Sequence, residues 1–344
     1  MNPAELFLAL TPERRALAFG EAAAQRGVSA VLFEKDFWVC WLLGVLFSDA
    51  DVAPHLVFKG GTSLAKVFGA IDRFSEDVDL SVSPAFVGAD AAAFETLSSR
   101  TRRDAAVAEM QRLCSAKVQD VIAPRLEAAL RDALGSPASS GSWLSFDVDP
   151  QAQSPNLHFG YPTGETAGLS YIRRSVKLEL GSLTDQQPVG RHAVRPWVAD
   201  AFSSVFSDWQ CEVIVLDLPR SFWEKASLLH AEYYRPADQP TPDRYSRHYA
   251  DVASLIEHPT EGTFLADKAL CGRVADWKSR VFARGWARYE LARHGSLRLA
   301  PPPHRLEALA SDYAVMRPMF LQEPPPFAEV VQRLAAAEQT INSM

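Results

Sequence analysis

Two aspartates, Asp77 and Asp79, stand two residues apart in a stretch where apolar and polar residues alternate. This alternation predicts a β-strand with Val78, Leu80 and Val82 on one face and both carboxylates on the other. At the rise of a strand, the two carboxylates lie roughly 6–7 Å apart. Oxygen ligands at this separation suit Mg²⁺, which usually binds one or two protein carboxylates and keeps its other positions for water and substrate phosphates.

A glycine pair, Gly60 and Gly61, follows the apolar run 56–58 and predicts a strand that ends in a tight turn. Thr62 or Ser63 can cap a helix that starts at this turn. The N–H groups at such a helix start attract phosphate. The stretch from the turn to the two aspartates therefore offers a cradle for a triphosphate, together with ligands for the metal ions that a triphosphate carries.

Apolar residues recur at helical spacing behind the turn, at Leu64, Val67, Phe68 and Ile71. The spacing i, i+3, i+4, i+7 predicts one helix whose apolar stripe reaches Ile71. Two cations in this stretch, Lys66 and Arg73, are candidate contacts for phosphate. A solvated Lys66 on the outer face of the helix would show the same pattern.

The sequences GGTSLAK at 60–66 and RFSEDVDL at 73–80 resemble the signature of the AbiEii/AbiGii-type toxins, the nucleotidyltransferase-like half of type IV toxin–antitoxin pairs. That family is similar in turn to the DNA-polymerase-β-like nucleotidyltransferases, whose pattern is Gly-Ser, a helix, and Asp-x-Asp. A Glu-Lys-Asp-aromatic-Trp helix at 34–38 extends the resemblance towards the N-terminus. The resemblance implies that the following residues contact the nucleotide: Gly60, Gly61, Thr62, Ser63, Lys66, Arg73 and Ser75.

The best candidate for a third carboxylate lies in the segment 175–181, where apolar residues alternate with Lys177 and Glu179. This pattern predicts a strand with both charged residues on one face. The resemblance implies that Glu179 completes the metal site with Asp77 and Asp79 and accepts the proton of the attacking hydroxyl. A strand with a solvated charged face would show the same pattern.

Two further residues are implied by short motifs in the second half of the chain. A helix predicted over 220–234 carries Lys225, and in the similar Glu-Lys helix of the family the lysine reaches the triphosphate as a compact point charge. The family's last motif, Arg-Asp-x-x-Asp, corresponds to Arg-His-Tyr-Ala-Asp at 247–251. Asp251 is thereby implied to hold Lys225 or to orient the site. An exposed helix face and an ordinary i, i+4 pair between Arg247 and Asp251 would also explain these residues.

The resemblance implies an α+β fold with a polymerase-β-like nucleotidyltransferase core, a mixed sheet flanked by helices. The expected domains are an N-terminal helical segment (1–50), the core (51–216) and a C-terminal helical domain (217–344). A length of 344 residues with 47% hydrophobic and 22% charged residues fits such a globular protein. No apolar run is long enough to span a membrane, and a cytoplasmic location is expected.

The four cysteines show no Cys-x-x-Cys spacing, which argues against a zinc site and a disulfide framework. The net charge of −7 hides a basic segment, because residues 268–305 contain nine Lys or Arg and two acids and so carry +7. Aromatic residues are interleaved with these cations. The pattern indicates either RNA binding or a helix with a basic outer face and a buried aromatic stripe.

Together with these patterns, the resemblance implies an Mg²⁺-dependent nucleotidyltransferase toxin with two Mg²⁺ ions, an NTP substrate and an antitoxin partner. The resemblance implies tRNA 3′ ends as the acceptor, and the basic segment 268–305 is the reason in the sequence itself to favour RNA. A small molecule or a protein is the alternative acceptor. The rival class is a nucleotide-binding protein without transferase activity. A P-loop kinase is excluded, because the motif G-x-x-x-x-G-K-[ST] is missing from the sequence.

Overall fold

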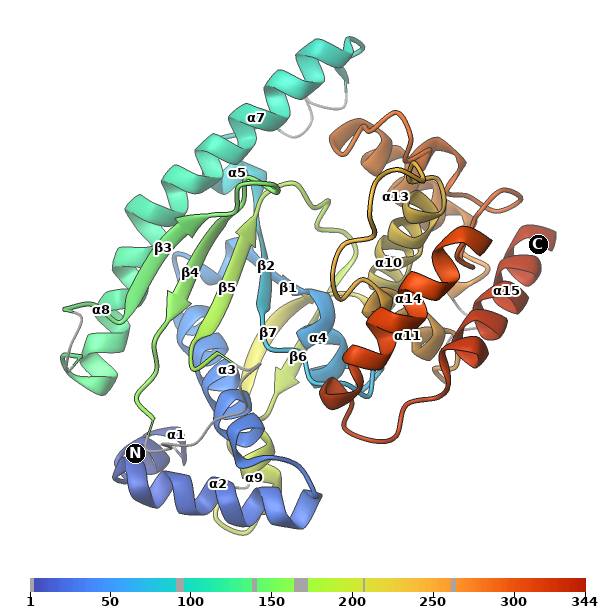
Figure 1. Ribbon diagram of the computed structural model, residues 1–344. Helices are drawn as coiled ribbons and strands as arrows, with labels where there is room; N and C mark the ends of the chain where they lie inside the picture. Colours follow the sequence, from blue (N-terminus) through green and yellow to red (C-terminus); the bar gives the residue numbers. More distant parts are fainter. Residues whose placement is uncertain (1–2, 91–95, 138–140, 164–172, 207, 261–263) are drawn as a thin grey trace. The chain divides into compact units, whose positions relative to one another are not determined.

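The structure is a computed structural model that describes residues 3–90, 96–137, 141–163, 173–206, 208–260 and 264–344 (Figure 1). The chain divides into two compact units. Unit 1 comprises Met1–Val67 and Glu76–Val215, and unit 2 comprises Phe68–Ser75 and Leu216–Met344. The short segment Phe68–Ser75 thus belongs to unit 2, although the chain on either side of it belongs to unit 1.

Unit 1 is built on a seven-stranded sheet with the order β3-β4-β5-β2-β1-β7-β6. The strands are β1 (Leu56–Lys59), β2 (Val78–Val82), β3 (Leu144–Val148), β4 (Pro155–Phe159), β5 (Val176–Gly181), β6 (Val189–Val194) and β7 (Cys211–Leu216). Strand β2 pairs in parallel with β5 and antiparallel with β1, while β1 pairs in parallel with β7. The sheet is therefore mixed, as expected from the sequence.

The apolar face of the sheet is continuous across its central strands. Phe159, Leu178, Leu80 and Phe58 lie in four different strands and are completely buried. Helix α3 (Ala30–Ser48) packs on this face, where the rings of Trp38 and Trp41 contact Phe159 of β4 at centroid distances of 5.7 and 6.0 Å. Residues 31–43 of α3 are all buried.

The other helices of unit 1 are α1 (Pro3–Leu8), α2 (Pro12–Arg26), α4 (Gly60–Lys66), α5 (Pro84–Val87), α7 (Arg100–Lys117), α8 (Ala123–Leu134) and α9 (Trp197–Ala201). Thr11 caps α2 by accepting a hydrogen bond from the Arg14 amide. A π-helical turn, Val118–Ile122, joins α7 to α8. The carboxylate of Glu127 on α8 accepts hydrogen bonds from the amides of Trp143 and Leu144, which places α8 beside the start of β3 (Figure 1).

Helix α4 is shorter than its apolar periodicity predicts. It ends at Lys66, and the chain leaves unit 1 after Val67. Gly69 adopts a positive φ of 58°, a conformation that L side chains rarely adopt. Phe74 then bonds through its amide to the Met319 carbonyl of unit 2. The prediction of one helix up to Ile71 was therefore wrong, because Phe68 and Ile71 belong to unit 2.

Unit 2 is helical, with α10 (Leu218–Tyr233), α11 (Ser246–Ile256), α13 (Lys268–Val281), α14 (Leu306–Val315) and α15 (Phe327–Ser343). Its core includes Phe222, Tyr249, Val252, Leu334 and Ile341, each at most 1% exposed. Arg73 forms an isolated β-bridge with Phe320, which fixes the inserted segment Phe68–Ser75 to this unit.

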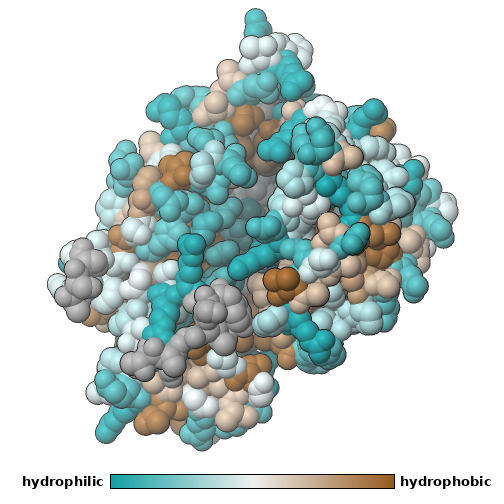
Figure 2. All heavy atoms as spheres, viewed as in Figure 1, coloured by the Kyte–Doolittle hydropathy of each residue, from teal (hydrophilic) through white to brown (hydrophobic). Residues whose placement is uncertain are grey.

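The predicted α+β class is confirmed by a mixed sheet with flanking helices in unit 1. Within the described ranges, no helix combines the length and the apolar character that crossing a membrane requires. The face drawn in Figure 2 is largely hydrophilic, with hydrophobic residues in small separate groups. Cys40, Cys114 and Cys271 are buried, Cys211 is partly buried, and all four are free thiols.

Candidate active site

Polar side chains form a row across one face of the sheet in unit 1. The register pairs Asn156 of β4 with Glu179 of β5. It pairs Glu179 in turn with Asp79 of β2, and Asp79 with Lys59 of β1. Because residues in register point to the same side of a sheet, these four side chains are neighbours on one face. Asp77 lies two residues before Asp79, immediately before β2 begins at Val78.

The row lies on the face opposite the apolar core. Val78 and Leu80 of β2 are completely buried, whereas Asp77 and Asp79 are partly exposed. Strand β5 shows the same alternation, and Glu179 is partly exposed with 37% of its side chain accessible. The structure therefore brings the predicted carboxylates of two neighbouring parallel strands onto one accessible face.

The glycine turn lies directly against this row. Gly60 has a φ of +81°, and a Cβ added to it would stand 1.9 Å from Oδ2 of Asp79. Only a glycine leaves room for the carboxylate here, because any side chain would collide with it and would also strain the backbone. The turn and the strand thus contact one another as the predicted cradle requires.

We expect Gly60→Ala to lower transfer by about 100-fold, because the methyl group must displace the Asp79 carboxylate by an ångström or more. The backbone strain adds a loss of about 1–3 kcal/mol in the free energy of unfolding. Gly88→Ala is the matched control, since Gly88 has a φ of +85° but nothing within 4 Å of its added Cβ. Steady-state kinetics and urea unfolding check both variants. Equal activity in the two would mean that the turn does not fix the carboxylate.

The hydroxyl groups of the turn bond to the main chain. Thr62 donates through Oγ1 to the Asp77 carbonyl at 2.5 Å, and Ser63 donates through Oγ to the Gly60 carbonyl at 2.9 Å. Both side chains are at most 2% exposed. The Thr62 bond ties the start of α4 to the residue that carries the first carboxylate.

Burial and charged neighbours shift the pKa of Asp77. Burial raises the pKa of Asp77, and the adjacent Glu76 and then Glu179 act in the same direction. Lys177 and Lys35 oppose this rise. Lys177 also forms an ion pair with Glu179 at 2.9 Å. The cluster is therefore one in which an added positive charge would be favourable.

The donor set fits a hard divalent cation such as Mg²⁺, because every candidate ligand is a carboxylate oxygen. The carboxylates of Asp77, Asp79 and Glu179 are the groups that would hold it. Across the part of the chain that is described, no three His, Cys, Asp or Glu side chains have the geometry of a metal site as they stand. Glu179 would have to exchange its bond to Lys177 for the cation.

Lys66 has a partner other than a phosphate. Its ammonium forms an ion pair with Asp36 of α3 at 2.6 Å and lies 5.0 Å from the centre of the Trp197 ring. The side chains of Lys66 and Asp36 are 7% and 2% exposed. The structure therefore assigns Lys66 to the packing of α4 against α3 and α9, and we do not include it in the nucleotide site.

A second cluster, in unit 2, joins three predicted residues. Both oxygens of Asp251 bind the Arg73 guanidinium at 2.7 Å, and Lys225 donates to Oδ2 of Asp251 at 2.8 Å. Asp251 is 1% exposed, so the alternative of an ordinary surface pair with Arg247 was wrong. The expected contact between Lys225 and Asp251 is present. Ser75, which was predicted to contact the nucleotide, lies in the same inserted segment as Arg73 and is partly buried.

Burial and neighbouring charges shift the pKa values of this cluster. Burial would raise the pKa of Asp251, but Arg73 and Lys225 overcome it and bring the pKa well below the ordinary value. Burial lowers the pKa of Lys225, against the attraction of Asp251. Burial also lowers the pKa of His248 well below its usual value, with Lys225 and Arg247 adding to the effect. Arg73 and Lys225 thus both bind the buried carboxylate of Asp251.

Much of the basic segment 268–305 is used inside unit 2. Five of its cations bind acceptors: Lys268 the Met344 carbonyl, Lys278 Glu224, Arg293 Asp276, Arg298 Glu338, and Arg305 the Pro236 carbonyl. Trp277 and Tyr289 are buried. Of the two interpretations of the basic segment, the structure therefore favours a buried aromatic stripe over an open basic surface.

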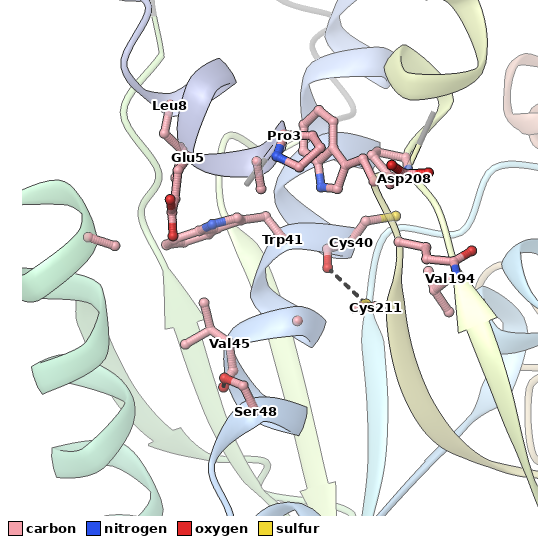
Figure 3. Close-up of a pocket in the computed structure, with 16 residues that line it drawn as sticks. Pro3, Glu5, Leu8, Cys40, Trp41, Val45, Ser48, Val194, Asp208 and Cys211 are labelled. Atoms are coloured by element: carbon pink, nitrogen blue, oxygen red, sulfur yellow. Dashed lines mark hydrogen bonds between the residues drawn. The ribbon is translucent and has the colours of Figure 1, made fainter. Parts of the chain in front are cut away.

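A cavity of about 370 Å³ lies in unit 1 among α1, α3, α8 and the start of β7 (Figure 3). Trp41, Trp209 and the thiols of Cys40 and Cys211 line it, and the Cys211 thiol lies 3.7 Å from the Cys40 carbonyl oxygen. None of the predicted site residues lines this cavity. It is therefore separate from the row of carboxylates.

A mixed sheet with a row of carboxylates beside a glycine turn is the arrangement expected of a nucleotidyltransferase. The family model described as "Nucleotidyl transferase AbiEii toxin, Type IV TA system" matches residues 41–333. The chain therefore belongs to the AbiEii family of nucleotidyltransferase toxins of type IV toxin–antitoxin systems, and it is a nucleotidyltransferase. The comparison with curated proteins found no match.

Two solved structures are similar to the chain. MenT4, a nucleotidyltransferase toxin from Mycobacterium tuberculosis H37Rv, has 17% sequence identity and a TM-score of 0.47, over 98% of this chain and 91% of that chain. JHP933 from Helicobacter pylori has 14% identity and a TM-score of 0.41, over 88% of each chain.

Several neighbours of the site were missed from the sequence. Lys59 and Asn156 enter the row only through strand register, which the sequence does not state. The amide of Asn156 donates to Asp147 at 2.7 Å, and its buried Oδ1 has no hydrogen-bond partner among the described residues. The alternation of polar and apolar residues in β4 is the one signal that could have indicated Asn156.

Proposed function

We propose that the protein transfers a nucleoside monophosphate from an NTP to the 3′ hydroxyl of an RNA, with tRNA as the acceptor. The acceptor oxygen bonds to the α-phosphorus, the bond from that phosphorus to the bridging oxygen breaks, and pyrophosphate leaves. The observation that carries this proposal is the register of Asp79 with Glu179 beside Gly60. Family membership supports the reaction class.

The carboxylates have distinct roles in this proposal. Asp77 and Asp79 would hold two Mg²⁺ ions, and Glu179 would complete the set of carboxylates. Bound Mg²⁺ would neutralise the triphosphate and lower the pKa of the acceptor hydroxyl. Glu179 lies in register with Asp79 and takes up the proton of that hydroxyl. The Gly60–Gly61 turn and the start of α4 present main-chain N–H groups to the phosphates.

We also propose that the ammonium group of Lys225 binds the triphosphate of the NTP. A lysine ammonium suits a phosphate, and the carboxylate of Asp251 holds Lys225 and Arg73 in fixed directions. Positioning and charge neutralisation then supply most of the rate, as is general for phosphoryl and nucleotidyl transfer. An antitoxin protein is the expected partner of a toxin of this family.

Incubation with each α-labelled NTP, Mg²⁺ and total tRNA tests the proposal. We expect label in RNA, one pyrophosphate released for each nucleotide added, and loss of both products when EDTA removes the divalent ions. Parallel reactions with a protein extract and with small-molecule hydroxyls test the alternative acceptors. Saturable binding of NTP without label in any acceptor would contradict the proposal and support a nucleotide-binding protein.

A further inference from the structure

Three consecutive charged residues lie buried in the first half of α3. Glu34, Lys35 and Asp36 are 3%, 2% and 2% exposed. Successive residues of a helix point about 100° apart, so these side chains leave the helix in three directions. Burying a charge is costly unless it is paired and hydrogen-bonded. The hydrogen-bond partners of these residues therefore indicate which segments each charge connects.

Two of the three residues bind segments outside the row of carboxylates. Glu34 accepts a hydrogen bond from the Thr163 hydroxyl at 2.8 Å. Asp36 accepts from Lys66 at the end of α4 and from the Trp197 amide at the start of α9, both at 2.6 Å. Asp36 thus joins α3 to α4 and α9, and Glu34 joins it to the segment that follows β4.

Lys35 differs from its neighbours in what it joins. Its ammonium donates to the Glu76 carboxylate at 2.6 Å and to the Arg173 carbonyl at 3.0 Å. Glu76 immediately precedes Asp77, and Arg173 lies three residues before the start of β5, the strand of Glu179. One buried ammonium thus binds both segments that lead into the strands carrying the carboxylates.

We propose that Lys35 is a positioning residue for nucleotidyl transfer, which holds the carboxylates of β2 and β5 at the separation that a shared divalent ion needs. This inference rests on the proposed function, because it assumes that Asp77 and Glu179 act together. Lys35 itself touches neither substrate nor ion. It acts through Glu76 on one side and through the main chain of Arg173 on the other.

The test is a double-mutant cycle on Lys35→Met and Glu76→Gln, read out as the affinity for Mn²⁺ in the presence of a non-hydrolysable NTP analogue. Isothermal titration well below the unfolding temperature measures this affinity independently of activity. We expect each single variant and the double variant to bind Mn²⁺ about tenfold more weakly, because partners of ligands typically contribute 10–100-fold. The effects should not add, since both variants break one contact.

Kinetics supply a second measurement on the same variants. We expect the kcat of Lys35→Met to fall by about 10–100-fold. Lys35→Arg should recover most of it, because a guanidinium can still bind Glu76. If Lys35→Met does not fold, Glu76→Gln and Lys35→Arg carry the test alone.

Asp36→Asn is the matched control, because Asp36 is the next residue of the helix, is equally buried and also pairs with a lysine. It should lower the unfolding temperature but leave the Mn²⁺ affinity within about twofold of the wild type, since its partners lie outside the row. Equal Mn²⁺ affinities in wild type, Lys35→Met and Glu76→Gln would overturn the inference. So would a loss in Asp36→Asn as large as that in Lys35→Met.

Different results would refute the proposed function and the role of Lys35. If the wild-type protein neither binds Mn²⁺ with the analogue nor transfers nucleotide, the metal assignment itself is wrong. If the wild type does both and Lys35→Met is unchanged, only the role of Lys35 is wrong.

Discussion

Replacing Asp79 with asparagine should reduce nucleotidyl transfer by about 10³-fold or more, because a lost carboxylate ligand removes several kcal/mol of transition-state stabilisation. Asp79 lies in register with Lys59 on one side and Glu179 on the other, and against the Gly60 turn. Asparagine has the same shape but no charge. Single-turnover transfer of labelled NMP to RNA measures the loss.

The fold should survive this substitution. Asp79 is partly exposed on the polar face, while Val78 and Leu80 on either side keep β2 in the core. We expect an unfolding temperature within a few degrees of the wild type, as is usual for substitutions outside the core. The exposed Asp132 of α8 offers a control, because Asp132→Asn should change neither property. Transfer at a wild-type rate by Asp79→Asn would show that the metal assignment is wrong.

Asp251→Asn should lower the free energy of unfolding by about 3–5 kcal/mol, because it leaves the buried Arg73 and Lys225 without their shared carboxylate. The three polar contacts of Asp251 are 2.7, 2.7 and 2.8 Å long, and its side chain is 1% exposed. The effect is large because two buried cations lose their partner at once. Urea unfolding of the full chain at pH 7 measures it.

The pH dependence of this loss gives a second check. The pKa of Asp251 is lower in the folded than in the unfolded chain, so its contribution is complete above the unfolded pKa of about 3.9. It is lost as the pH falls from there towards the folded pKa. The difference between wild type and Asp251→Asn should therefore be constant from pH 5 to pH 8 and shrink below about pH 4.

A surface pair in unit 2 provides the control for Asp251. Arg317 and Glu323 form an ion pair with side chains 63% and 69% exposed, so Glu323→Gln should cost less than about 1 kcal/mol. A loss in Asp251→Asn as small as that of Glu323→Gln would mean that the Arg73–Lys225–Asp251 cluster does not stabilise unit 2.

The strands of the site could be predicted from the sequence because their signals are local. The alternation around Asp79 and Glu179 predicts β2 and β5 within one residue of their observed bounds. The cap of α2 at Thr11 follows from its residue type. In each case the deciding interactions lie within a few residues of one another.

The course of the chain after α4 could not be predicted in the same way. The spacing of apolar residues at 64, 67, 68 and 71 shows that they recur at helical intervals. It does not show in which hydrophobic core they pack. The segment Phe68–Ser75 packs in unit 2 through partners distant in sequence, such as Met319 and Asp251. Apolar residues at helical spacing therefore cannot distinguish a longer helix from a chain that ends its helix and passes from one unit to the other.

Charged residues were harder to place than apolar ones for a related reason. The pairs Lys66–Asp36 and Lys35–Glu76 join positions 30 and 41 residues apart. A count of charges likewise could not show that Lys278 and Arg298 of the basic segment bind carboxylates within unit 2. What a charge binds depends on the tertiary structure, so the site's outer contacts emerge only from the coordinates.

The central claim is that carboxylates of β2 and β5 share divalent ions beside the glycine turn. Anomalous diffraction from crystals soaked with Mn²⁺ and a non-hydrolysable NTP tests it most directly. We expect anomalous peaks within ligand distance of Asp77, Asp79 and Glu179, with the triphosphate against Gly60 and Gly61. An ordered nucleotide whose Mn²⁺ lies away from all three carboxylates would contradict it.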